Sequence, residues 1–400
     1  MRIAKDVYWV GVLDPQLRIF DVIVQARWGT TYNSYLVLGQ DKTAIIDTVK
    51  AGFERTFLER IANVVEPSKI DYIILNHLEP DHSGALPALL EQAPKARIVV
   101  SKNGAHFVKN LLNQDLDAMV VGDGDLIDLG GRTLKFISAP FLHWPDTMFT
   151  FLAEDGILFP CDAFGCHFCH EALYDDLVGD FHDARKAYYD QIMRPFAEHV
   201  MKAHEKIKDL PIRMIAPSHG PILRSEPWRY IDEYVSWSAP ISDVRRSGAR
   251  SREILVLYTS AYGNTERMAR AIVEGAVAPG VDVSLINIAQ LDMSEMLPKI
   301  EAADAIIVGS PTINGDVLKP VWDLLSSLAT IKLRGKIGAA FGSYGWSGEA
   351  VKMIEERMKS LKFKVIEPGI RAILTPDEEA LRQCRELGRK VAEMVATSSK

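Results

Sequence analysis

The chain has few cysteines and no long run of apolar residues. Only four of its 400 residues are cysteines, and three of them, Cys161, Cys166 and Cys169, crowd into nine residues beside two histidines. This spacing does not resemble a secreted disulfide framework. No apolar stretch reaches the 18 residues of a membrane span, and the first residues lack the apolar core of a signal peptide. We therefore expect a cytoplasmic protein with no membrane partner.

An excess of basic charge is also missing. The formal net charge is −7, with a quarter of the residues charged. An acidic chain argues against nucleic acid as the main partner. The one cluster of arginines lies among serines and a glycine at residues 242–251, which indicates a solvated linker. The length and the 48% of hydrophobic residues are typical of a globular protein with two domains.

The pattern of apolar residues changes at this linker. Ahead of it, β-rich runs lie at 21–26, 34–38 and 43–47, and helical patterns at 52–65 and 183–208. Mixed strands with covering helices predict a layered α/β domain over residues 1–248. Beyond the linker, strands and helices alternate regularly from the strand at 254–258 onward. Five such βα units predict a doubly wound parallel sheet over residues 249–400.

Four metal-capable side chains, His77, Glu79, Asp81 and His82, occur within six residues. They directly follow the apolar run 72–75, which predicts a buried strand, so the ligands fall on the loop that leaves it. Imidazoles and carboxylates are both present and no thiolate lies among them. This mixture suits iron, manganese or zinc at a reactive centre better than a closed structural zinc site.

Three further candidate ligands, His143, Asp162 and His219, also follow predicted strands. Alone, each histidine would more often be a hydrogen-bonded core residue, and the aspartate a turn or helix cap. Together they favour a metal site, because an α/β sheet presents its ligands beyond the carboxyl ends of its strands. The full set is His77, Glu79, Asp81, His82, His143, Asp162 and His219. These are too many ligands for one ion but suit two ions with a bridging carboxylate.

Three loops of the second domain combine small residues with hydrogen-bonding groups. The first joins the strand at 254–258 to a helix, where hydroxyls and backbone N–H groups form an anion site. Its single glycine suggests a monophosphate rather than a dinucleotide, although Gly-Asn-Thr also suits an ordinary turn and cap. The candidate cofactor-binding residues are Thr259, Ser260, Tyr262, Gly263, Asn264, Thr265, Pro311, Thr312, Asn314, Gly315, Ser343, Tyr344, Gly345, Trp346 and Gly348.

The order of the metal motifs resembles the metallo-β-lactamase fold, whose hydrolases carry a His-x-His-x-Asp-His loop. Here Glu79 stands at the second histidine, and its anionic oxygen favours ferric iron over hydrolytic zinc. With the segments His143-Trp144-Pro145-Asp146 and Asp162-Ala163-Phe164-Gly165, the whole chain resembles the flavodiiron proteins, or A-type flavoproteins. The three loops resemble those of flavodoxins, which implies FMN. The expected fold is an N-terminal metallo-β-lactamase-like αβ/βα sandwich followed by a flavodoxin-like doubly wound parallel sheet.

The resemblance also implies how two iron ions would be held. His77, Glu79 and His143 would bind one iron, Asp81 and His219 the other, and Asp162 would bridge them. Members of the family differ in whether the histidine at position 82 binds directly. Cys166 and Cys169 match no family motif, and buried small hydrophobic residues are favoured over oxidisable thiols.

The function that the resemblance implies is reduction of dioxygen to water, of nitric oxide to nitrous oxide, or of both, at a non-haem di-iron site fed by FMN. A metallo-β-lactamase-fold hydrolase with a flavodoxin-like appendage is the alternative, and an electron carrier with a structural metal domain is a third. The family implies a head-to-tail homodimer or a dimer of dimers. Since no Cys-x-x-Cys pair follows the flavin segment, an external donor is expected, either a rubredoxin-like protein or a reduced deazaflavin.

Overall fold

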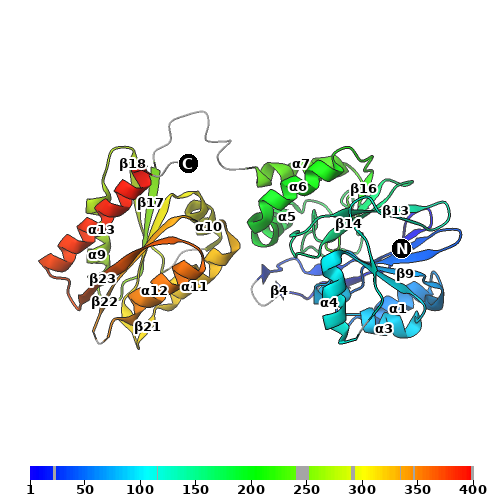
Figure 1. Ribbon diagram of the computed structural model, residues 1–400, viewed down its shortest axis with the longest axis horizontal. Coiled ribbons are helices and arrows are strands. Elements are labelled where there is room, and N and C mark those ends of the chain that lie inside the picture. Colours follow the sequence, from blue (N-terminus) through cyan, green and yellow to red (C-terminus); the bar gives the residue numbers. More distant parts are fainter. Residues whose placement is uncertain are drawn as a thin grey trace. The chain divides into compact units, whose positions relative to one another are not determined.

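The computed structural model describes residues 1–20, 24–114, 116–239, 252–289, 293–333, 335–345 and 347–397. The chain forms two compact units, Met1–Ala239 and Pro240–Lys400 (Figure 1). The domain boundary predicted between residues 248 and 249 lies outside the described residues. So does the first half of the strand predicted at 21–26.

Two sheets dominate the first unit. In spatial order the first contains β1 (Arg2–Ala4), β2 (Val7–Trp9), β7 (Tyr35–Leu38), β8 (Thr43–Ile46), β9 (Tyr72–Leu75), β10 (Arg97–Val100) and β11 (Met119–Val120). The second contains β12 (Leu126–Asp128), β13 (Thr133–Ser138), β14 (Met148–Leu152), β15 (Ile157–Phe159) and β16 (Met214–Ile215). Two short pairs are β3 (Val12–Asp14) with β6 (Thr30–Tyr32) and β4 (Ile19–Phe20) with β5 (Val24–Gln25).

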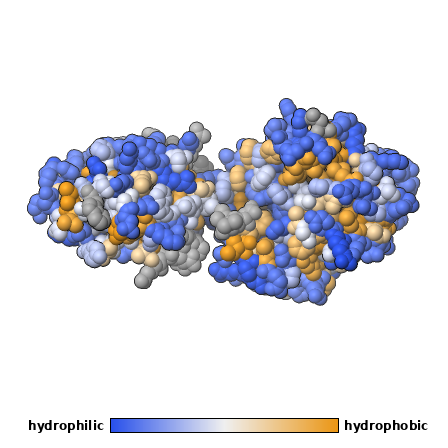
Figure 2. Space-filling view, turned by 90° about the horizontal axis from the view of Figure 1, so that it is seen from below, coloured by the Kyte–Doolittle hydropathy of each residue, from blue (hydrophilic) through white to orange (hydrophobic). Residues whose placement is uncertain are grey.

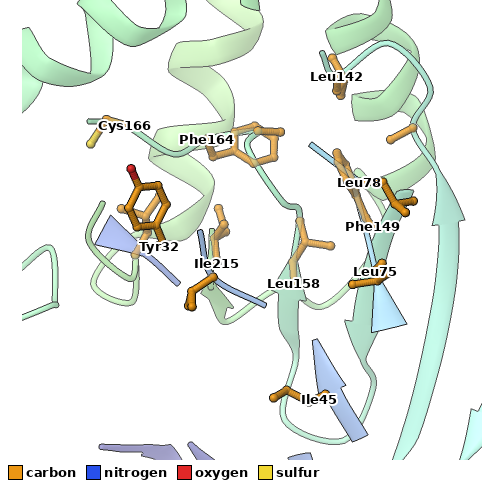
Figure 3. Close-up of a cluster of buried hydrophobic side chains, with 14 of the residues drawn as sticks. Tyr32, Ile45, Leu75, Leu78, Leu142, Phe149, Leu158, Phe164, Cys166 and Ile215 are labelled. Carbon is orange, nitrogen blue, oxygen red and sulfur yellow. The ribbon is translucent and has the colours of Figure 1, made fainter. Parts of the chain in front are cut away.

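Strand β9 shows why its sequence is apolar at nearly every position. Ile74 belongs to the core between the two sheets, together with Phe136 of β13 and Phe159 of β15. Its neighbour Ile73 belongs to the other core, which also contains buried residues of helices, and Leu75 lies there too (Figure 3). Because successive side chains of a strand point to opposite faces, a sheet covered on both faces needs a continuous apolar run.

Helices cover the outer faces of the two sheets (Figure 1). They are α1 (Glu54–Ala62), α2 (Pro80–Ser83), α3 (Leu86–Gln92), α4 (Lys102–Leu112), α5 (His182–Tyr188), α6 (Ala197–Ile207) and α7 (Pro227–Ser238), with a 3₁₀ turn at Pro67–Lys69. The helix predicted at 183–208 is interrupted between α5 and α6 by a π turn, Tyr189–Met193, and a 3₁₀ turn, Arg194–Phe196. Pro195 lacks the N–H that a continuous α-helix requires there, so the hydrogen-bond pattern changes.

The second unit is one largely parallel sheet between two helical layers. Its main strands in spatial order are β18 (Val281–Asn287), β17 (Arg252–Tyr258), β19 (Ala305–Gly309), β22 (Ile337–Tyr344) and β23 (Lys364–Ile373), with the short pair β20 (Thr312–Ile313) and β21 (Asp316–Val317) beside β22. The helices are α9 (Asn264–Ala276), α10 (Met293–Ala302), α11 (Lys319–Ser327), α12 (Glu349–Ser360) and α13 (Glu378–Thr397), and a 3₁₀ turn covers Leu328–Thr330.

This strand order is the 2-1-3-4-5 order of doubly wound sheets. Buried residues of α9 and α13 pack in one core and those of α10, α11 and α12 in the other, so each face of the sheet is covered. The α/β sandwich of the first unit and the doubly wound sheet of the second confirm the predicted fold class. Among the described residues, no helix is long and apolar enough to cross a membrane.

Candidate dinuclear metal centre and flavin site

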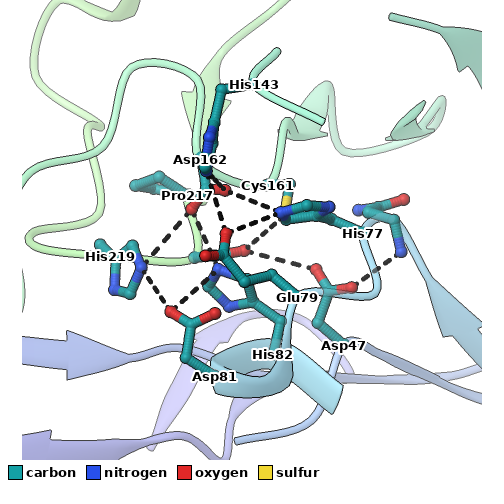
Figure 4. Close-up of polar contacts among 12 residues, drawn as sticks. Asp47, His77, Glu79, Asp81, His82, His143, Cys161, Asp162, Pro217 and His219 are labelled. Atoms are coloured by element: carbon teal, nitrogen blue, oxygen red, sulfur yellow. Dashed lines mark hydrogen bonds and ion pairs between the residues drawn. The ribbon is translucent and has the colours of Figure 1, made fainter. Parts of the chain in front are cut away.

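The seven predicted metal ligands lie together in the first unit, although they come from four separate segments (Figure 4). The loop after β9 and the short helix α2 carry four of them. The loops after β13, β15 and β16 carry His143, Asp162 and His219. All are buried except His143, whose side chain is 16% exposed. The solvent-accessible side of the cluster is therefore that of His143.

The cluster has two similar halves. In the first, Glu79 Oε2 lies 3.1 Å from His77 Nε2 and 3.0 Å from His143 Nε2. In the second, Asp81 Oδ2 lies 3.0 Å from His219 Nε2 and 3.4 Å from His82 Nε2. Each half therefore brings two imidazole nitrogens and one carboxylate oxygen to a common point.

Asp162 lies between the halves and offers one oxygen to each. Its Oδ2 is 3.5 Å from the Nε2 atoms of His77 and His143. Its Oδ1 is 3.0 Å from His82 Nε2 and 3.5 Å from His219 Nε2. A carboxylate in this position has the geometry of a bridge between two metal ions.

Several of these contacts fit coordination better than hydrogen bonding, although the His77–Glu79 and His82–Asp162 pairs also have hydrogen-bond geometry. Two ligand atoms about 2.1 Å from one first-row metal ion and at right angles lie about 3.0 Å apart. Both oxygens of Asp81 and Oδ2 of Asp162 are buried, yet within the described part of the chain they form no hydrogen bond of acceptable geometry. The histidine nitrogens nearest to these oxygens lie 3.0–3.5 Å away, but not in hydrogen-bond geometry. This arrangement is expected when the lone pairs of both atoms point at one shared ion. The donor set, imidazole with hard carboxylate oxygen, suits iron.

The site is also electrostatically balanced. Burial raises the pKa of Asp162, but the charges of His82, His77 and His219 outweigh it and hold the pKa well below its usual value. Burial alone would lower the pKa of His82, and the carboxylates of Asp81 and Asp162 instead raise it to about 9. The anionic form of Asp162 thus depends on positive charge close to it, which bound cations would also supply.

Buried partners fix the orientation of two of the histidines. Asp146 Oδ1 lies 3.3 Å from His77 Nδ1, and its Oδ2 accepts a hydrogen bond from the Leu78 N–H at 2.8 Å. His219 Nδ1 donates to the carbonyl of Thr31 at 2.7 Å. Both contacts place the ring proton on Nδ1, so that the Nε2 lone pair faces the cluster.

The sequence pointed to the seven candidate ligands that the structure brings together, but not to most of these supporting residues. Asp146 had a signal, because it belongs to the same motif as His143. No sequence motif pointed to the turn that follows β6. In that turn Asn33 donates from Nδ2 to the carbonyls of Pro217 and Gly220 and so holds the loop of His219. His167, which contacts the ring of His219, is one of the two histidines beside the three clustered cysteines and had no further signal in the sequence.

The cysteines near the site are free thiols. Cys161 and Cys166 are buried, and Cys169 is only partly so. Burial raises the pKa of Cys166 to about 12 and that of Cys169 to about 11, which disfavours the reactive thiolate. These values support the packing role that the sequence favoured.

The three candidate flavin loops lie side by side at the carboxyl ends of β17, β19 and β22. The hydroxyls of Thr265 and Ser343 are 2.9 Å apart, which joins the first loop to the third. Thr312 accepts a hydrogen bond from the Ala350 N–H and so joins the second loop to the first turn of α12, which follows the third loop. The order of β17 and β19 makes this edge the switch point at which doubly wound sheets bind their ligands.

Within the first loop, Gly263 has φ +81° and precedes α9 without a side-chain cap. The N-terminus of this 13-residue helix would suit the anionic phosphate of a flavin, and the Glu266 N–H donates there to the Ser260 hydroxyl at 3.4 Å. Gly348 has φ +76°, and a Cβ there would come within 2.9 Å of the Tyr344 ring. Tyr262 is 90% exposed, and Trp346 lies outside the described residues.

A two-metal β-lactamase-type unit followed by a flavodoxin unit defines a class of flavin- and metal-dependent redox proteins. Residues 30–220 match the family model described as ODP family beta lactamase, and residues 256–388 match the flavodoxin family model. Relatives and solved structures similar along the whole chain include the following four.

The type A flavoprotein of Rhodobacter capsulatus is 45% identical, covering 98% of this chain and 91% of its own. The flavo-diiron protein FprA2 of Clostridium acetobutylicum is 40% identical, covering 99% of both chains. A nitric oxide reductase of Moorella thermoacetica is 39% identical, again covering 99% of both. The solved structure of the rubredoxin oxygen:oxidoreductase from Desulfovibrio gigas is 31% identical with a TM-score of 0.73, covering 99% of this chain and 98% of that one.

The chain belongs to the flavodiiron protein family. The resemblance found in the sequence is thus confirmed, as are the cofactors of that family, FMN and a pair of iron ions.

Proposed function

We propose that the protein is an oxidoreductase that reduces dioxygen to water, nitric oxide to nitrous oxide, or both, at a di-iron site fed by FMN. The observation that carries this proposal is the pairing of the halves across Asp162. Each half offers two imidazole nitrogens, one terminal carboxylate and one oxygen of Asp162. Four protein ligands per ion leave coordination positions for a small substrate. Relatives named for nitric oxide reduction and for rubredoxin:oxygen oxidoreduction support both substrates.

When bound, reduced FMN supplies two electrons and a ferrous pair supplies two more. These four electrons match the reduction of dioxygen to two waters. Two electrons suffice to convert two nitric oxide molecules into nitrous oxide and water. The side chains hold this chemistry in place. Glu79 and Asp81 each balance the charge of one half, and Asp162 keeps the halves at a fixed separation. Asp146 and Thr31 hold His77 and His219 in the tautomer that binds metal.

The hydrolase alternative is not favoured. Hydrolytic zinc needs high Lewis acidity, and anionic ligands reduce it. Here Glu79 Oε2 lies 3.0–3.1 Å from two imidazole nitrogens, so it occupies the position of a ligand rather than that of a surface residue. Whole-chain similarity to flavodiiron proteins also weighs against hydrolysis.

A rubredoxin-type electron donor fits the family, and we propose that such a protein supplies the electrons; a reduced deazaflavin is the second proposal. Apolar residues reach the surface of the first unit, as the face drawn in Figure 2 illustrates. Phe141, 40% exposed and two residues before His143, is one of them. Such a residue beside the accessible ligand supports a docking surface there, which fits the proposed head-to-tail homodimer or dimer of dimers. A cytoplasmic location is likewise proposed.

The direct test uses iron- and FMN-replete protein, reduced without oxygen and then mixed with dioxygen or with nitric oxide. Flavin absorbance and dissolved gas are recorded together. We expect flavin oxidation coupled to loss of at least one of the gases, with nitrous oxide formed from nitric oxide. A replete sample that consumes neither gas contradicts the proposal. Full activity of a strictly monomeric protein would contradict the proposed dimer only.

A further inference from the structure

A small pocket of the second unit lies outside the metal cluster and the flavin loops. Its volume is about 230 Å³, and residues of α12 and β23 line it. Three carboxylates and three basic groups belong to this lining, and none of them is a candidate metal ligand or flavin contact. Pockets for drug-sized ligands typically measure about 300–1,000 Å³. This one therefore suits a smaller, charged molecule.

A bulge in β23 gives the pocket its shape. Residues 367–369 of this strand stand opposite the single residue Ala340 of β22. Extra residues of this kind bend a strand away from its neighbour. Gly369 ends the bulge, and a Cβ there would come within 2.6 Å of Val351 on α12. Glycine thus lets the strand lie directly against the helix beside the pocket.

Glu355 carries the buried carboxylate of the pocket. It lies one helical turn after Val351 on the same face of α12 and is 7% exposed. Its Oε1 accepts a hydrogen bond from the Gly369 N–H at 2.5 Å, but its Oε2 has no hydrogen bond or ion pair in the described part of the chain. Burial raises the pKa of Glu355, although the Gly369 N–H and the charges of Lys359 and Arg371 oppose this effect. Because a buried acceptor without a donor is costly, Oε2 indicates a ligand that donates to it.

Arg371 is the second charged group left without a partner. It lies on β23 and forms no hydrogen bond or ion pair with any described residue. The other four charges of the pocket pair with each other, Lys359 with Glu367 at 2.5 Å and Lys352 with Glu356 at 3.9 Å. A carboxylate oxygen and a guanidinium group therefore remain for a ligand that itself carries both charges.

We propose that the pocket binds a free α-amino acid with an apolar side chain. The ammonium group of this ligand donates to Glu355 Oε2, its carboxylate accepts from the Arg371 guanidinium, and its side chain packs against Val351. A guanidinium group matches a carboxylate with two parallel hydrogen bonds, and charge-assisted hydrogen bonds are stronger than neutral ones. Since neither iron nor FMN takes part, the inference is independent of the proposed function.

Calorimetric titration of the iron- and FMN-replete protein tests this binding. The probes are the free amino acids alanine, valine, leucine, isoleucine, methionine and proline. For the tightest of them, the amine that lacks the carboxylate and the acid that lacks the ammonium group are titrated as well (2-methylpropylamine and 3-methylbutanoate in the case of valine). The variants are Glu355→Gln and Arg371→Gln. The control is Lys364→Gln, at an exposed position of β23 outside the pocket. FMN content and the thermal transition show whether each variant folds.

We expect at least one of the six amino acids to bind, one molecule per chain, with a Kd below about 1 mM. The matched amine and acid should bind roughly tenfold more weakly, and both pocket variants should lose about the same factor, because each change removes a charge-assisted interaction. Lys364→Gln should bind like the unchanged protein. Binding of none of the six overturns the proposal, and so does undiminished binding in Arg371→Gln. An amine that binds as tightly as its amino acid also overturns it, because the site would then be one for cations only. Arg371 is exposed, so its variant decides the question even if Glu355→Gln does not fold.

Discussion

Replacing Asp146 by asparagine tests whether an outer partner sets the metal affinity of the cluster. Asp146 is 1% exposed, and its Oδ2 is held by the Leu78 N–H at 2.8 Å. In Asp146→Asn the amide oxygen will keep that hydrogen bond, which turns the amide NH₂ toward His77 Nδ1. Two donors then face each other, so the imidazole proton moves to Nε2. That nitrogen is the one that would otherwise bind metal.

The magnitude follows from the loss of one outer partner. Removing such a group typically lowers metal affinity 10- to 100-fold, which corresponds to about 1.4–2.7 kcal/mol. We expect the half that contains His77 to lose iron affinity by this factor, while the half that contains His219 keeps its affinity. The assay is an anaerobic titration of metal-free protein with ferrous iron against a competing chelator. FMN content and the thermal transition are recorded on the same samples.

The matched control is Asp175→Asn, which changes a buried carboxylate of the same unit that holds a loop rather than a ligand. Asp175 is 6% exposed and accepts hydrogen bonds from the backbone N–H groups of Arg224 and Ser225 and from the Tyr230 hydroxyl. This variant should lose about 1–3 kcal/mol of stability but keep its iron affinity. The reasoning is refuted if Asp146→Asn binds iron as tightly as the unchanged protein, or if Asp175→Asn loses as much affinity.

Three further predictions concern the metal type, the flavin loop and the core. Glu79→His exchanges an anionic oxygen for a third imidazole in one half, so purified protein should contain less iron and reduce no gas; full activity would argue against the ligand role. Gly348→Ala should lower FMN affinity roughly tenfold, because an alanine with a left-handed backbone is strained by about 1–2 kcal/mol and its Cβ meets Tyr344. The control is Gly335→Ala, where the backbone is also left-handed but the Cβ would meet open space. This variant should lose stability without losing FMN. Leu158→Ala, fully buried in the first unit, should cost about 2–5 kcal/mol in the calorimetric transition of that unit and leave flavin release unchanged.

The sequence was sufficient for the fold class and for picking out the seven candidate ligands that the structure brings together. Alternating strands and helices after residue 252 give a doubly wound sheet by local periodicity alone, and the structure has that strand order. The clustering of the seven candidate ligands was also predictable, because each follows an apolar strand and the carboxyl ends of strands meet at one place. The prediction of one long helix at 183–208 was wrong in one respect. Local composition favours a helix throughout, and Pro195 changes the hydrogen-bond pattern in its middle.

Only the tertiary structure decided how the ligands divide and what holds them. That Asp162 turns one oxygen to each half depends on side-chain orientation, which motif spacing does not determine. His219 receives its tautomer from Thr31, 188 positions earlier, and His167 is held by Thr30, 137 positions earlier. Packing brings such pairs together after the strands have formed, and hydrogen bonds across that distance leave no local pattern in the sequence. The sequence by itself determined which chemistry the protein carries, and the fold decided which atoms face the reacting centre.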